Sequence, residues 1–212
     1  MISLKIKWLG HASFLIETSD KKIYIDPYAL SQGSEPADLI LITHDHYDHC
    51  DINAINEIKE SEAHILGSES VANKISGVGI LRSGDVTDFE GIKVKAVPYY
   101  NIGKHFHPRD SGIGFVIEAE GKRIYHAGDT DLIPEMKELG GITVALLPVG
   151  GTYTMNSDDA VEAVKVIKPE IAVPMHYGSI VGSRKDAYRF KSRSETETDT
   201  RVEILENRSL EI

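Results

Sequence analysis

Thr43 to His49 is the segment of this 212-residue sequence whose side chains are best suited to chemistry. It contains three imidazoles and the Asp48 carboxylate, and it directly follows the apolar run Leu39 to Ile42. A short β-branched apolar run closed by turn-forming residues is typical of a buried strand, and ligands usually bind in the loop leaving such a strand. Histidine and aspartate supply donors that zinc, iron and manganese accept. The spacing therefore predicts a metal site rather than a polar loop with solvated histidines. Its four candidate ligands are His44, His46, Asp48 and His49.

Two later residues, Asp129 and His176, have the same placement, because each stands at the end of a predicted strand. Gly128, beside Asp129, permits close approach of the backbone to a ligand. Taken alone, an aspartate in a Gly-Asp-Thr turn is usually a turn former, and a histidine after a strand is usually an ordinary polar residue. Since strand ends converge at one edge of a sheet, we expect both side chains to join the metal site.

Strands and helices alternate along the whole chain, and no low-complexity linker interrupts them. The pattern predicts one α/β domain over residues 1–212. Helices are expected after the caps Asp51 and Ser157, each with apolar residues on one face. Asp85 to Gly91 reads as a turn-rich link, and Tyr99 to Gly112 as a long aperiodic loop of the kind that is often functional.

A short internal similarity relates two parts of the sequence. Lys22 to Asp26 resembles the stretch that runs from Arg123 through Tyr125 to Asp129. Two short matches are weak evidence, but they favour a duplicated half.

Composition limits the compartment and the partners. The chain carries 33 acidic and 23 basic residues, a formal net charge of -10, which disfavours a broad nucleic-acid or membrane surface. The single cysteine, Cys50, fits a reducing compartment. The beginning, Met1 to Lys7, alternates like a strand and lacks the apolar core of a signal peptide. We therefore expect a cytoplasmic protein with a small-molecule substrate and no nucleic-acid or membrane partner. A homo-oligomer stays open.

The motifs, in their order along the chain, resemble the metallo-β-lactamase superfamily. The residues that carry this resemblance are His44-x-His46-x-Asp48-His49, Gly128-Asp129-Thr130 and His176. The resemblance spans nearly the whole chain and implies a four-layer αββα sandwich of two mixed β-sheets, with a metal-bearing cleft at one edge. Leu9 to Leu15 and Pro174 to Gly178 are similar to the branch that includes ascorbate-phosphate lactonases and N-acyl-phosphatidylethanolamine-type phospholipases.

The resemblance also implies roles for the candidate ligands. His44 and His46 would bind a first divalent metal, Asp48, His49 and His176 a second, and Asp129 would bridge the two. Two such ions activate a water molecule for attack on a carbonyl carbon or on phosphorus, and Asp48 would be the catalytic residue that orients this water. Zinc is the first expectation, with manganese and iron as alternatives. Thr43, Thr130 and Asp26 are candidates for holding the imidazoles.

One position departs from the superfamily pattern. A further histidine normally follows a strand between the first motif and the Gly-Asp turn, whereas Tyr99-Tyr100-Asn101 stands there in this sequence. Either the long loop folds back so that His107, or failing that His105, completes the first metal's ligands, or that metal is held weakly. The alternative for His107 is a solvated loop histidine.

His11, in a predicted tight turn, has two interpretations. A purely structural role is common for such a position, whereas the resemblance favours a place at the cleft rim in contact with substrate.

Three functions remain after these arguments. The first is a metal-dependent hydrolase of a small ester, lactone or phosphodiester. The second is a metal-binding or ligand-sensing protein of the same fold with little activity. The third is a nuclease, against which the acidic balance argues.

Overall fold

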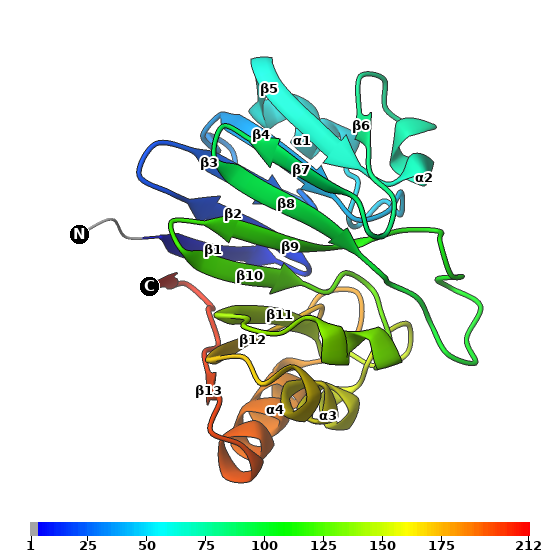
Figure 1. The fold of residues 1–212 in the computed structure, drawn as a ribbon, viewed down its shortest axis with the longest axis vertical. Coiled ribbons are helices and arrows are strands. Elements are labelled where there is room, and N and C mark those ends of the chain that lie inside the picture. Colours follow the sequence, from blue (N-terminus) through cyan, green and yellow to red (C-terminus); the bar gives the residue numbers. More distant parts are fainter. Residues whose placement is uncertain (1–3) are drawn as a thin grey trace.

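The computed structural model describes residues 4–212, so residues 1–3 of the predicted first strand lie outside the described part. Two seven-stranded sheets pack against each other, and helices cover their outer faces (Figure 1). The first sheet has the order β14 (Ser209–Glu211), β1 (Lys5–Gly10), β2 (Ser13–Glu17), β3 (Lys22–Ile25), β4 (Ala37–Ile42), β5 (Lys59–Gly67) and β6 (Gly79–Ile80). The second has the order β13 (Arg201–Val202), β12 (Ile171–Met175), β11 (Val144–Pro148), β10 (Lys122–His126), β9 (Gly114–Ala119), β8 (Ile92–Val97) and β7 (Val86–Phe89). The helical segments are α1 (Ile52–Ile58), α2 (Glu69–Ala72), the 3-10 helix η1 (Pro134–Glu138), α3 (Ser157–Ile167) and α4 (Arg184–Glu197). The predicted αββα sandwich is confirmed.

The two sheets repeat one pairing pattern. From β14 to β3, and from β7 to β10, successive strands pair antiparallel. From β3 to β6, and from β10 to β13, they pair parallel. The internal sequence similarity lies on β3 and β10, which are the central strands of their sheets. The topology therefore has the repeat that a duplicated half requires.

Strand β4 anchors the predicted metal-binding segment because both of its faces are buried. Leu39 and Leu41 belong to the core between the sheets, whereas Ile40 and Ile42 belong to the core beneath α1. Each fully buried side chain of this size contributes roughly 1.5–3 kcal/mol. The loop that follows β4 therefore starts from a rigid point.

The caps and the edges of the sheets differ in part from expectation. Asp51 caps α1 as predicted, accepting from the backbone N–H groups of Asn53 and Ala54. The cap of α3 is Asn156 rather than Ser157, because Asn156 has the extended backbone of a cap and its side chain accepts from Asp158 and Asp159. The predicted link over residues 85–91 contains strand β7. Within residues 4–212 this edge strand pairs only with β8, and it lacks the apolar alternation of a buried strand.

No helix within residues 4–212 combines the length and apolarity that crossing a membrane would require.

Candidate metal centre

Three histidines form a first group of potential metal ligands. The donor atoms of His44, His46 and His107 all lie within 4.8 Å of one another. His107 Nε2 is 3.3 Å from His46 Nδ1, although the two residues are 61 positions apart. His44 and His107 are buried, whereas His46 is exposed to solvent. The long loop between β8 and β9 thus folds back over the motif and brings in His107, while His105 stays exposed.

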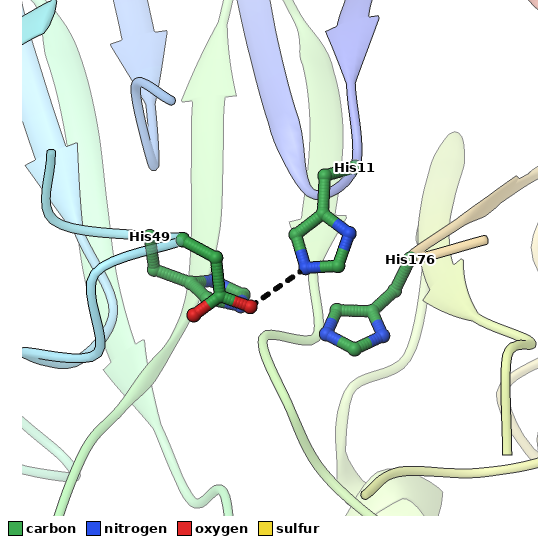
Figure 2. A group of neighbouring side chains, drawn as sticks. His11, His49 and His176 are labelled. Atoms are coloured by element: carbon green, nitrogen blue, oxygen red, sulfur yellow. Dashed lines mark hydrogen bonds and ion pairs between the residues drawn. The ribbon is translucent and has the colours of Figure 1, made fainter. Parts of the chain in front are cut away.

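A second group combines His11, Asp48, His49 and His176 within the same limit. Figure 2 shows its three histidines converging from the β1–β2 turn, the loop after β4 and the end of β12. Asp129, from the end of β10, stands between the groups. Its carboxylate oxygens lie 2.9 Å from His176 Nε2, 3.2 Å from His49 Nε2 and 3.5 Å from His107 Nε2. This position is the one expected for a bridging ligand.

His11 lies inside the second group. Its side chain is buried, its Nε2 lies 2.9 Å from Asp48 Oδ2, and its ring centroid is 4.0 Å from that of His176. The backbone carbonyl of His11 also accepts from the N–H of His176 at 2.8 Å. This hydrogen bond ties the β1–β2 turn to the end of β12, and His11 also lines a groove beside the centre. His11 is therefore a positioning partner of Asp48 and a fourth potential donor. Its contact with substrate stays a prediction.

Asp26 holds imidazoles of both groups. Its carboxylate is fully buried and accepts from His49 Nδ1, from the Thr43 hydroxyl and from the Thr43 backbone N–H, each at 2.7 Å. Since the Thr43 hydroxyl donates to Asp26, it accepts from His44 Nδ1 at 2.9 Å. Both imidazoles therefore carry their proton on Nδ1 and turn Nε2 toward the centre.

Asn101 orients the imidazole of His107, as Asp26 orients that of His49. Its side-chain oxygen accepts from both the backbone N–H and Nδ1 of His107, at 3.1 and 3.0 Å. Its amide nitrogen donates to the carbonyl of Tyr153 at 2.9 Å. The sequence offered one signal for this role, since Asn101 stands near the position of the missing histidine. Thr130 holds no imidazole, contrary to expectation, because its hydroxyl bonds to backbone carbonyls including that of Tyr100 and so anchors the loop.

The chemistry of the donor set fits divalent metal ions. Among residues 4–212, several buried side-chain atoms of the two groups and of Asp129 form no hydrogen bond of acceptable geometry, although Asp129 lies 2.9 Å from His176 Nε2 and 3.2 Å from His49 Nε2. They are His11 Nδ1, His44 Nε2, His49 Nε2, Asp129 Oδ1 and both ring nitrogens of His176. Such atoms are rare in folded proteins because each costs about 1–3 kcal/mol. Each deprotonated imidazole offers one nitrogen lone pair and Asp129 offers a carboxylate oxygen, and such a cluster is what zinc, manganese or iron would satisfy.

Burial and neighbouring charges shift the pKa values of histidines in the two groups in opposite directions. Burial lowers the pKa of His107 to about 4, and burial together with the neighbouring His49 holds the pKa of His44 well below its usual value. Burial also opposes charge on His49, but the carboxylates of Asp129 and Asp26 raise its pKa well above the usual value. Despite burial, His176 and His49 hold the pKa of Asp129 well below its ordinary range. At neutral pH His44 and His107 are thus ready to bind metal, whereas His49 of the metal-free protein carries a second proton, on Nε2 beside Asp129.

Metal loading of the metal-free protein at pH 7 is therefore expected to release at least about one proton, from His49. The pKa of His49 is raised, so this proton is present at pH 7 and is lost as the pH rises through that pKa, which strengthens metal binding. Calorimetry in PIPES and in HEPES buffer measures the release, because the two buffers bind metal weakly and differ in ionisation enthalpy. Equal binding enthalpies in both buffers would contradict the assignment.

Gly150, in the loop after β11, is pressed against the backbone of His176. A Cβ atom at this position would lie 2.1 Å from the His176 carbonyl oxygen. Gly150→Ala is therefore expected to displace His176, to cost about 3 kcal/mol of stability and to weaken metal binding. Thermal unfolding and metal content measure the two effects. Gly121→Ala is the control, since its Cβ meets nothing within 4 Å and only its positive φ of 74° costs about 1 kcal/mol. Equal effects of both variants would refute the steric argument.

The fold and the centre define a class of protein, and comparison with known proteins agrees with it. The family described as a beta-lactamase superfamily domain matches residues 5–176, so the chain belongs to this superfamily. It is 37% identical to a UPF0173 metal-dependent hydrolase of Pelotomaculum thermopropionicum, over 95% of this chain and 96% of that protein. It is 38% identical to a UPF0173 metal-dependent hydrolase of Thermoplasma acidophilum, over 92% of this chain and 93% of that protein.

Solved structures agree with the fold. A protein from Parabacteroides distasonis superimposes with a TM-score of 0.86 at 33% identity, over 97% of this chain and 94% of its own. A metallo hydrolase of the archaeon Ignicoccus hospitalis gives a TM-score of 0.83 at 27% identity, over 99% of this chain and 98% of its own. The predicted metallo-β-lactamase superfamily and enzyme class are confirmed, whereas the narrower branch stays a prediction.

Proposed function

We propose that this protein is a hydrolase that depends on two divalent metal ions and acts on a small ester, lactone or phosphodiester. The observation that carries the proposal is the pair of ligand groups that meet at Asp129, with unpartnered buried nitrogens aimed between them. Two relatives are named metal-dependent hydrolases, and these names support the proposal. His44, His46 and His107 would hold one ion, and Asp48, His49 and His176 the other.

The chain's own residues set the geometry of the reaction. When bound, the ions supply a water molecule of lowered pKa and positive charge for the developing oxyanion. Asp48 lines the cavity above the centre, and its hydrogen bond to His11 helps to hold its pKa below the ordinary range in spite of burial. It therefore stays a carboxylate that accepts a hydrogen bond from the attacking water and orients it. His11 is the positioning residue that holds this carboxylate.

Zinc is the proposed metal, because mixed imidazole and carboxylate donors suit it, with manganese and iron as alternatives. Elemental analysis of protein purified without added metal, combined with a screen of esters, lactones and phosphodiesters, tests the proposal. We expect about two equivalents of metal and turnover that a chelator abolishes. His46→Ala should lower turnover by more than about 100-fold, and it carries little folding risk because His46 is exposed. Tight metal binding without any turnover would instead favour the ligand-sensing alternative.

A further inference from the structure

One cavity opens directly onto the candidate ligands. It has a volume of about 260 Å³ and is bounded on its inner side by His46, Asp48, His107 and Asp129. Its outer side is formed by Tyr47, Phe106, Tyr153 and Ile180. A larger groove of about 800 Å³ runs past Trp8 and Tyr177, but His11 is the single candidate ligand in its lining within residues 4–212. The smaller cavity is therefore the place where a substrate would meet the metal centre.

The outer side of this cavity is apolar although it faces solvent. Tyr47 is 63% exposed, Phe106 50% and Ile180 37%, and they come from three different loops. A fourth loop contributes Tyr153, whose ring meets that of Phe106 edge to face at 4.7 Å. Exposed apolar groups gathered around a concave site are typical of a surface that binds an apolar ligand.

Positive side chains do not reach the cavity within the described residues, since its lining contains no lysine or arginine. The lysine and the arginine on the β8–β9 loop, which also carries Phe106, already have polar partners. Lys104 donates to Asp131 at 2.7 Å and to the carbonyl of Thr154 at 2.8 Å, and Arg109 pairs with Glu135 at 2.5 Å. An anionic group outside the reacting centre would therefore find no counter-charge on the cavity wall.

We infer that the site selects esters or lactones whose acyl or aryl group is small, apolar and uncharged over substrates that carry an anionic group beside the reacting centre. The apolar group lies between Tyr47 and Ile180 on one side and the Phe106–Tyr153 pair on the other. The volume limits that group to about the size of a phenyl ring or a short alkyl chain. This inference rests on the proposed function and names its substrate class.

Binding of unreactive probes tests the inference without turnover. Butyrophenone has the shape of a neutral aryl or acyl substrate but no bond to hydrolyse, and 4-butyrylbenzenesulfonate is the same ketone with an anionic group on the ring, away from the carbonyl. Calorimetry on the metal-loaded protein should give tighter binding for butyrophenone than for the sulfonate. Phe106→Ala should weaken butyrophenone binding roughly fivefold, because a half-exposed aromatic ring contributes only part of its full burial energy.

Ile102→Ala is the matched control. Ile102 belongs to the same loop and is 55% exposed, but it does not line the cavity. Its loss should leave butyrophenone affinity unchanged, and metal content should be the same in all three proteins. Tighter binding of 4-butyrylbenzenesulfonate, no measurable binding of butyrophenone, or equal effects of the Phe106 and Ile102 variants would overturn the inference.

Kinetics separate this inference from the proposed function. On a phenyl acetate, butyrate and hexanoate series, Phe106→Ala should raise KM for the longer esters and leave kcat unchanged, because Phe106 touches the acyl group and not the reacting atoms. If no ester, lactone or phosphodiester is hydrolysed although butyrophenone binds as expected, the proposed function fails and the apolar site stands. If esters are hydrolysed but Phe106→Ala changes no KM, the proposed function stands and the inference fails.

Discussion

His107→Ala is expected to lower hydrolysis at least about 100-fold and to remove one of two bound metal equivalents. His107 is one of three imidazoles in the first ligand group, and its Nε2 points at His46 and Asp129. Without it, the first ion would keep two histidines and a shared carboxylate, too few for a closed set of protein ligands. The second group should keep its metal, because His107 is not part of it. Metal analysis and kcat on an ester found in the screen measure both effects.

His105→Ala is the natural control for this experiment. It removes the same side chain from the same loop, two positions away, where the imidazole is exposed. Activity and metal content should stay at the level of the unsubstituted protein. If both variants lose activity equally, activity depends on the conformation of the whole loop and His107 is not a metal ligand. If His107→Ala keeps two metal equivalents, the first ion is held by other groups.

Asp26→Ala is expected to cost about 3–5 kcal/mol of stability and to weaken metal binding at least about 10-fold. The reason is that three donors, His49 Nδ1 and the hydroxyl and N–H of Thr43, lose one buried acceptor at once. Thr43 is also the partner of His44, so the loss reaches both ligand groups. Chemical denaturation and metal titration give the two numbers.

Asp26→Asn separates the causes. Asp26 has a positive φ of 46°, a conformation that asparagine tolerates, so the backbone should stay in place. The amide still offers an oxygen to Thr43 but no longer a charged acceptor for His49. We expect a loss of stability between those of the unsubstituted protein and Asp26→Ala, with metal binding nearly as weak as in Asp26→Ala. If Asp26→Ala changed neither the free energy of unfolding nor the metal affinity, the hydrogen bonds of Asp26 would not be needed to position the ligands.

The candidate ligands next to buried strands could be predicted from the sequence. The segment after β4 and the residues after β10 and β12 follow apolar strands, and the direction of a buried strand fixes where its end lies. His107 could not be assigned in the same way, because its loop has no periodicity. Its course depends on contacts with distant segments, such as the hydrogen bond from Asn101 to Tyr153, 52 positions away.

Other features could not be predicted from the sequence for similar physical reasons. His11 packs against His176, which lies 165 positions later, so the contact leaves no local pattern. Strand β7 was missed because an exposed edge strand needs no apolar alternation. Asn156 and Ser157 are both good caps, and which of two neighbours caps a helix is decided by backbone angles that composition does not specify.

The repeated pairing pattern of the two sheets has a consequence for how the domain holds together. His11 in the β1–β2 turn and His107 in the β8–β9 loop occupy equivalent places in their sheets, and each ligand group draws donors from both sheets. Metal ions at this centre would act as cross-links between the two halves of a chain whose one cysteine precludes an internal disulfide. Metal occupancy and sheet-to-sheet packing are therefore thermodynamically linked. Any substitution that loosens the core between the sheets should also weaken metal binding, however far the substituted residue lies from the ligands.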